Sequence, residues 1–222
     1  MTSAFGGTYR SRPQEEVLKE LQALRPFEGA FTLDHCVFFV DDNIVSNRGY
    51  AGLFLGFETL SPETLAAVCK RVNRPNQYYD VVQKLHDHGI GIGGSFVFGF
   101  DTDDAGVFDR TLEFVTRAKL EVAYFSILTP YPGTRLHHRL AEERRILSQD
   151  WSTYDGSHVV YRPKTFTPEQ LLDGYLRTWQ QAYSVPTICR RLWGTTAWKS
   201  FFYPMNFGFR QSVRGLANSG GT

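Results

Sequence analysis

Short apolar runs alternate along the chain with longer segments in which apolar residues recur every three or four positions. The runs are rich in β-branched and aromatic residues and predict buried strands, whereas the periodic segments predict amphipathic helices. Strands are predicted at residues 36–40, 52–57, 90–99 and 122–128. Because strands and helices alternate, the pattern favours a parallel sheet with right-handed crossovers.

Helix boundaries are marked by capping signals. Helices are predicted at residues 13–24, from 61 to about 74, and at 76–88, 107–118 and 136–145, with a further one from 167. Ser61-Pro62-Glu63 combines an N-cap residue, a first-turn proline and an acidic residue. Thr167 and Gln170 have the spacing of a capping box. The sequence Glu142-Glu143-Arg144-Arg145 is interpreted as an exposed helix face.

Each predicted strand ends in polar or turn-forming residues. These ends are Asp41-Asp42-Asn43, Glu58, Asp101 and the segment 129–134. The carboxyl ends of parallel strands meet at one edge of a sheet, where α/β folds place their chemistry. The pattern therefore predicts a ligand site, although polar residues also end strands that bind nothing.

One connection is too short for the predicted topology. Only residues 41–51 separate the first two strands, whereas a parallel crossover needs about a dozen residues or more. Either these strands are not parallel neighbours, or a strand–helix unit is absent from the chain. We favour the second interpretation. A sheet left half open has an unpaired edge, so we expect an oligomer or a partner chain to cover it.

Composition changes near residue 150, which suggests a main domain at 1–149 and a small extension at 150–222. A short strand-like piece is predicted at residues 158–161. The segment 193–214 is aromatic and basic and includes Trp193, Phe202 and Lys199. It would suit a cover over the main domain, a partner interface or a membrane surface, and domain cover is favoured because a large exposed apolar patch is a liability.

The overall composition limits the classes of protein to which this chain can belong. A hydrophobic content of 42% excludes general disorder, and a net charge of +1 gives no reason to expect a nucleic-acid partner. No apolar run is long enough to span a bilayer, and the amino terminus lacks the apolar core of a secretory signal. Cys36, Cys69 and Cys189 are too far apart for a disulfide framework or a metal cluster. A reduced, cytoplasmic location is therefore expected.

Several blocks occur together in a recognisable order. They are Phe39-Val40-Asp41-Asp42-Asn43, residues 56–65, residues 94–101 and Leu128-Thr129-Pro130-Tyr131-Pro132-Gly133-Thr134, followed by residues 150–156 and 161–163. This arrangement resembles the radical S-adenosylmethionine (SAM) superfamily, in the group whose longer members carry a cobalamin-binding domain. The resemblance implies an α/β fold with a partial, incomplete TIM-barrel-like parallel sheet and a small, mainly helical carboxy-terminal extension.

The resemblance also implies SAM and a 4Fe–4S cluster as cofactors, but the chain departs from the family here. Family members hold the cluster on a CxxxCxxC loop, and the three cysteines of this chain lack that spacing. The cluster passes an electron to SAM, and thiolates are its usual ligands. The chain therefore resembles a shortened or internally deleted derivative, and we expect that alone it cannot assemble the cluster or cleave SAM.

The resemblance implies roles for residues of a SAM pocket. Asp41 and Asp42 stand where the family accepts the SAM amino group, and Glu58 where it contacts the ribose or methionine moiety. The segment from Ser95 to Gly99 corresponds to the strand that lets adenine approach, and Tyr131 flanks adenine. The alternatives are strand-end capping for the aspartates, a salt-bridged loop carboxylate for Glu58, and a bulge or tight helix contact for Gly91, Gly93 and Gly94. No catalytic residue is assigned.

Three functions remain open at this point. The first is a radical SAM family protein that is a fragment or a partner-dependent subunit. The second is an α/β hydrolase or lyase-type enzyme that binds Mg²⁺ through Asp41, Asp42, Glu58 and Asp101, since carboxylates at strand ends suit this ion. The third is a non-catalytic binding remnant. The first two predict a small-molecule ligand.

Overall fold

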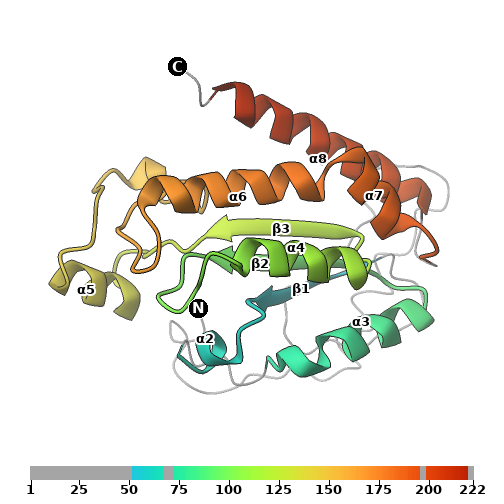
Figure 1. The fold of residues 1–222 in the computed structure, drawn as a ribbon, viewed down its shortest axis with the longest axis horizontal. Helices are drawn as coiled ribbons and strands as arrows, with labels where there is room; N and C mark the ends of the chain where they lie inside the picture. Colours follow the sequence, from blue (N-terminus) through green and yellow to red (C-terminus); the bar gives the residue numbers. More distant parts are fainter. Residues whose placement is uncertain (1–51, 68–72, 196–198, 220–222) are drawn as a thin grey trace, which may run out of the picture. The chain divides into compact units, whose positions relative to one another are not determined.

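The structure is a computed structural model that describes residues 52–67, 73–195 and 199–219 (Figure 1). The helix predicted at 13–24, the strand predicted at 36–40 and the short link that follows it lie outside the described residues. All the described residues belong to one compact unit. Among them, no helix is both long and apolar enough to cross a membrane.

Three parallel strands form the sheet. They are β1 (Gly52–Glu58), β2 (Gly91–Phe98) and β3 (Val122–Ile127), and they pair in the order β1-β2-β3. Helix α3 (Tyr78–Asp87) lies between the first two strands in sequence, and α4 (Val107–Arg117) lies between the last two. The structure thus confirms three of the predicted strands and the parallel α/β fold, as an open part of a TIM-barrel-like sheet (Figure 1).

The remaining helices follow the predicted signals in part, since no helix was predicted at 151–153, 185–192 or 199–219. They are α2 (Pro62–Ala67), η3 (Pro75–Gln77), α5 (Arg135–Glu142), η4 (Trp151–Thr153), α6 (Pro168–Ala182), α7 (Val185–Leu192) and α8 (Lys199–Ser219). The capping box at the start of α6 is confirmed in full. Helix α5 ends before its predicted end at Arg145, since Arg144 has a left-handed φ of +53°. The strand predicted at 158–161 is reduced to one antiparallel bridge between Ile146 and Tyr161.

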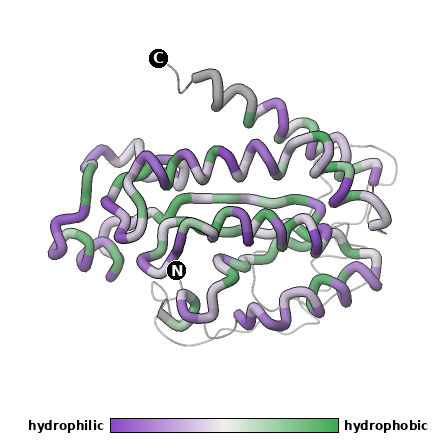
Figure 2. Tube along the Cα trace, viewed as in Figure 1, coloured by the Kyte–Doolittle hydropathy of each residue, from purple (hydrophilic) through white to green (hydrophobic). Residues whose placement is uncertain are grey.

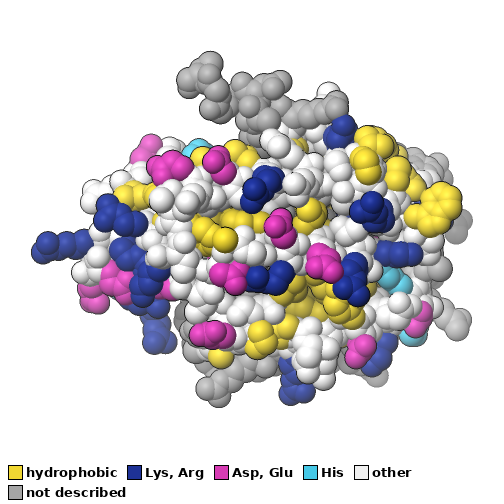
Figure 3. Space-filling model, in the orientation of Figure 1, with side chains coloured by type: hydrophobic (Ala, Val, Ile, Leu, Met, Phe, Trp, Pro, Cys, Tyr) yellow, Lys and Arg dark blue, Asp and Glu magenta, His cyan; other side chains and the backbone are white. Residues whose placement is uncertain are grey.

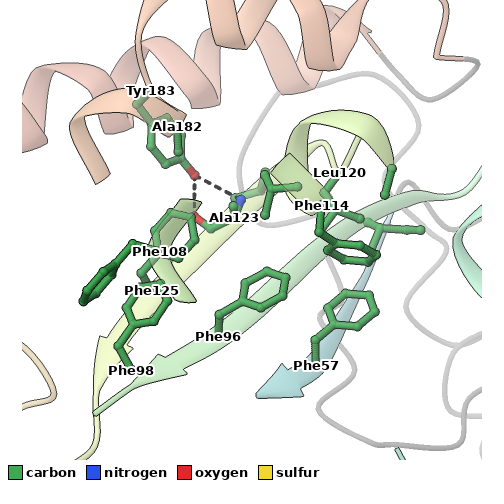
Figure 4. Close-up of a cluster of buried hydrophobic side chains, with 14 of the residues drawn as sticks. Phe57, Phe96, Phe98, Phe108, Phe114, Leu120, Ala123, Phe125, Ala182 and Tyr183 are labelled. Carbon is green, nitrogen blue, oxygen red and sulfur yellow. Dashed lines mark hydrogen bonds between the residues drawn. The ribbon is translucent and has the colours of Figure 1, made fainter. Parts of the chain in front are cut away.

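One face of the sheet carries a row of phenylalanines. The rings of Phe57, Phe96, Phe125 and Phe98 stack on their neighbours with centroid separations of 5.4–6.0 Å (Figure 4). Helices α3, α4 and α6 cover this face, and the strands are more hydrophobic than the helices around them (Figure 2). Burial of these aromatic side chains is the main favourable contribution to the stability of the sheet.

Gly94 of β2 is required by this packing. A Cβ atom at this position would lie 2.7 Å from Leu120 Cδ1 and 2.9 Å from a ring carbon of Phe57. Both distances are shorter than real Cβ contacts, so a side chain would push the aromatic layer away from the sheet. Gly94 is therefore a tight packing contact with a strand and a loop, and not the tight helix contact given as the alternative to ligand binding.

The carboxy-terminal extension closes the free edge of β3. The Tyr183 hydroxyl donates to the Ala123 carbonyl at 2.8 Å and accepts from the Ala123 N–H at 3.2 Å (Figure 4). Trp179 Nε1 donates to the Phe125 carbonyl at 3.2 Å, and the Ile127 N–H donates to the Gly156 carbonyl at 2.7 Å. At the edge of β3, two side chains and the Gly156 carbonyl of the same chain therefore pair with backbone groups that would otherwise be exposed.

A fully buried arginine joins the extension to the start of β3. The Arg191 guanidinium of α7 donates to the carbonyls of Leu120, Glu121 and Ala182 at 2.8, 3.1 and 3.0 Å. It also donates to Asn206 Oδ1 of α8 at 2.7 Å. The loop before β3 and three helices therefore converge on one cation near the amino end of β3.

Candidate functional site

The carboxyl edge of the sheet brings together the strand ends predicted to bind a ligand. Glu58 ends β1 with a left-handed φ of +62°, and Gly99 follows β2 directly with a φ of +101°. Tyr131 lies in the loop that follows β3 and is 46% exposed. Since the three strands are parallel, these residues share one edge. Asp41 and Asp42 lie outside the described residues.

Ser95 lies on the sheet face opposite the phenylalanine row. It pairs with Gly56 of β1 and Tyr124 of β3, and paired residues of parallel strands share a face. Ser126 of β3, on the same face, is half-buried and donates to the Phe96 carbonyl at 3.4 Å. Towards the strand starts, Phe54 packs edge-on against Tyr124 at 5.2 Å. The face is therefore aromatic at one end and lined by small residues towards the carboxyl edge.

Two surface hollows in the described part of the chain are not lined by Glu58, Ser95, Gly99 or Tyr131. The larger, about 870 Å³, is lined mainly by α3 and the end of α4, and the smaller, about 290 Å³, lies beside the start of α6. The volume of a hollow therefore does not identify the candidate site. The position of the strand ends is the better guide, because ligands of parallel α/β folds bind at the carboxyl edge of the sheet.

Asp101 anchors the loop after β2 through a salt bridge that the sequence analysis missed. Arg145 donates to Asp101 Oδ1 at 2.7 Å and to Oδ2 at 3.2 Å, and Arg139 and Lys164 approach Oδ2 at 3.3 and 3.4 Å. Burial alone would raise the pKa of Asp101, but the hydrogen bonds and charges of Arg145 and Lys164 outweigh it and lower the pKa.

Two sequence-based interpretations change as a result. Arg145 is only 8% exposed, so the prediction that it lies on an exposed helix face is wrong, whereas Glu142 and Arg144 are exposed as expected. Asp101 has both oxygens engaged by cations, which makes it a poor ligand for Mg²⁺. Within the described ranges, no group of three or more potential metal ligands is found.

Asp103 is a second carboxylate that holds the Gly99 turn. Its Oδ2 accepts the N–H groups of Gly99 and Phe100 at 2.8 and 3.0 Å, while its buried Oδ1 has no hydrogen-bond partner. The Tyr161 hydroxyl donates to the Gly99 carbonyl from the other side. Burial raises the pKa of Asp103 to about 6, although the two N–H groups oppose this shift. An aspartate shortly after a strand-ending glycine is the only sequence signal for this role.

The raised pKa of Asp103 predicts a pH-dependent stability. The folded-state pKa lies above the ordinary value of 3.8, so the folded state binds this proton more tightly than the unfolded chain does. The stabilising contribution is complete below about pH 4 and is lost as the pH rises through about 6. Between pH 5 and pH 7.5, the free energy of unfolding of the wild-type chain should fall by about 1 kcal/mol. That of Asp103→Asn should not show this fall, and urea unfolding measures both.

The exposed neighbour provides the control for this experiment. Hydrogen bonding to Arg110 lowers the pKa of Asp104, so Asp104→Asn should not flatten the pH dependence. Equal pH dependence in the wild type and in Asp103→Asn would contradict the assignment.

The chain is similar in sequence to several known proteins. Residues 134–197, from the start of α5 to beyond α7, match a family model described as a domain of unknown function, DUF4070. The chain is 36% identical over 151 residues to bacteriochlorophyllide d C-12(1)-methyltransferase of Chlorobaculum tepidum, which covers 68% of this chain and 33% of that protein. It is 25% identical over 183 residues to bacteriochlorophyllide d C-8(2)-methyltransferase of the same organism, with 80% and 41% covered.

A third relative has a different activity. The chain is 22% identical over 120 residues to anaerobic magnesium-protoporphyrin IX monomethyl ester cyclase of Cereibacter sphaeroides, covering 54% of this chain and 19% of that protein. The chain thus spans between a third and two fifths of the length of the two methyltransferases. By their names, two of these relatives are methyltransferases and the third is a cyclase. The chain is a member of the radical SAM superfamily, in the group related to the radical SAM proteins that contain a cobalamin-binding domain.

Proposed function

We propose that this chain supplies the adenosyl side of a SAM-binding site in a radical SAM methyltransferase. The proposal is supported mainly by one observation: the ends of three parallel strands present Glu58, Gly99 and the Tyr131 loop along one edge. The names of two relatives, both methyltransferases, support methyl transfer as the reaction class. The substrate of the assembled protein is a small molecule.

Each proposed contact follows from the chemistry of SAM. The Glu58 carboxylate would accept hydrogen bonds from ribose hydroxyls or from the methionine moiety, and Asp41 and Asp42 would accept them from the amino group. Ser95 carries little bulk beside β2, so a flat adenine ring can approach the backbone of this strand. Tyr131 would flank the ring with its aromatic side chain.

The described residues do not fit a 4Fe–4S cluster. Cys189 is the one cysteine among them, and it is exposed on α7, the helix whose Arg191 binds at the amino end of β3. A cluster needs several thiolates at one place. We therefore propose that this chain is a fragment or a partner-dependent subunit, that cluster ligands come from a partner chain, and that the chain alone binds SAM without cleaving it.

Binding of SAM to the 222-residue chain tests the proposal. Isothermal titration calorimetry should give saturable binding of SAM, and Glu58→Gln should weaken it by about ten-fold, since hydrogen bonds to a charged group contribute about 1.5–3 kcal/mol. Ser95→Val, which adds bulk to the proposed adenine face, should weaken binding to a similar extent. Arg135→Gln, at an exposed position on α5, should leave the affinity unchanged.

Thermal-shift titrations separate the alternatives. A ligand that binds the folded state raises the melting temperature, so SAM should stabilise the chain and Mg²⁺ should not. Stabilisation by Mg²⁺ alone would favour a hydrolase or lyase, and stabilisation by neither ligand would favour a binding remnant. A reducible cluster after anaerobic reconstitution with iron and sulfide would contradict the assignment of the cluster ligands to another chain.

A further inference from the structure

The carboxy-terminal part of the chain has a strongly biased charge. The whole chain has 24 basic and 23 acidic residues, yet no aspartate or glutamate follows Asp173. The last 49 residues contain Lys and Arg but no Asp or Glu, and they are rich in Trp, Tyr and Phe. Much of this aromatic content packs inside, as for Phe202, which is 4% exposed and confirms the predicted cover.

Helix α7 presents the part of this segment that is not used as cover. Val185 is 40% exposed, Cys189 is exposed one turn later, and Trp193 at the helix end is 77% exposed. The opposite side of α7 is buried through Ile188 and Leu192. The expectation of domain cover is therefore wrong for Trp193. Figure 3 shows hydrophobic side chains gathered over α7, with basic side chains beside them.

Two cations border these apolar residues. Arg190 is exposed on α7, and the Lys119 ammonium donates to the Trp193 carbonyl at 2.9 Å. We name Val185, Cys189, Arg190, Trp193 and Lys119 the α7 patch. Asp80 and Asp87 of α3 line the hollow next to Lys119, which bounds the patch on that side.

We propose that the α7 patch docks this protein on an anionic membrane surface. A tryptophan with an exposed ring and a polar N–H is suited to the headgroup region, where one end of the ring is apolar and the other hydrated. Stable attachment needs a second signal besides apolar contact, and cations near anionic lipids supply it. The absence of carboxylates from the last 49 residues removes the repulsion that would otherwise oppose this contact. The inference does not depend on SAM binding.

Co-sedimentation of the full chain with lipid vesicles tests the proposal. Vesicles of phosphatidylcholine with about one third phosphatidylglycerol should bind the chain, and pure phosphatidylcholine vesicles should bind it much more weakly. Added salt should weaken binding, because it screens exposed charges. Arg190→Gln should reduce partitioning by about five-fold, the effect of removing one interfacial cation, and Trp193→Ser by about ten-fold.

Matched controls exist near the other end of β3. Trp151 is 59% exposed on η4, close to the segment that pairs with the end of β3, so Trp151→Ser should leave partitioning unchanged. Arg135→Gln on α5 is the control for charge. Equal binding to both vesicle types, or unchanged binding of Trp193→Ser, would overturn the proposal. Concentration-dependent dimers that Trp193→Ser abolishes, without vesicle binding, would overturn it in favour of a second copy of the chain.

Discussion

Replacing Arg191 by methionine is expected to lower the free energy of unfolding by about 3–5 kcal/mol. The side chain is fully buried, and it donates to three backbone carbonyls and to Asn206. Methionine fills a similar volume but donates no hydrogen bond, so four acceptors would lose a donor in the interior. Burial also lowers the pKa of Arg191, which reflects the cost of placing this charge away from water.

The adjacent arginine provides the control for this measurement. Arg190→Met changes the same residue type at an exposed position and should alter the unfolding free energy by less than about 0.5 kcal/mol. Arg191→Lys keeps the charge, but a single ammonium cannot reach all four acceptors, so it should fall between the other two variants. Urea unfolding of the three variants measures these differences in the free energy of unfolding. A loss below about 1 kcal/mol in Arg191→Met would show that the network is not a stabilising centre.

Gly99→Ala is expected to destabilise the chain by about 2–4 kcal/mol. The φ of +101° is one that residues with a Cβ rarely adopt. A Cβ would also meet the Tyr161 hydroxyl, and it would lie 2.9 Å from Leu171 Cδ2. Both neighbours are fully buried, so neither can move away easily.

Gly133→Ala separates backbone strain from crowding. Gly133 also has a positive φ, of +75°, but no atom lies within 4 Å of a Cβ built there. Its substitution should therefore cost only the strain, about 1 kcal/mol. The difference between the two variants in urea unfolding measures the crowding at the end of β2. Equal losses would show that Tyr161 and Leu171 yield readily.

The strands were predictable because their composition differs sharply from that of the flanking segments. The strand predicted at 90–99 is observed as Gly91–Phe98, and that at 122–128 as Val122–Ile127. Their apolar runs are bounded by glycine or polar residues, and such boundaries are local features of the sequence. The start of α6 was predictable for the same reason, because Thr167 and Gln170 satisfy each other within one turn.

Interactions between distant residues were not predictable in this way. Asp101 and Arg145 are 44 positions apart, and nothing in either local sequence indicates the other. Arg191 looks like any other basic residue at the end of an amphipathic helix, and only the fold brings Leu120 and Asn206 to it. Of the proposed SAM contacts, the sequence order alone predicts that Glu58 and Gly99 share an edge, because parallel strands require it. Their conformations, with positive φ, are known only from the structure.

The contacts between the end of α6 and β3 restrict where a further strand can be added to this sheet. Tyr183 and Trp179 bond backbone groups of β3 that an added strand would need. A strand from another chain therefore cannot pair with this edge without first displacing both side chains. Any further strand would therefore have to join the sheet at an edge other than that of β3.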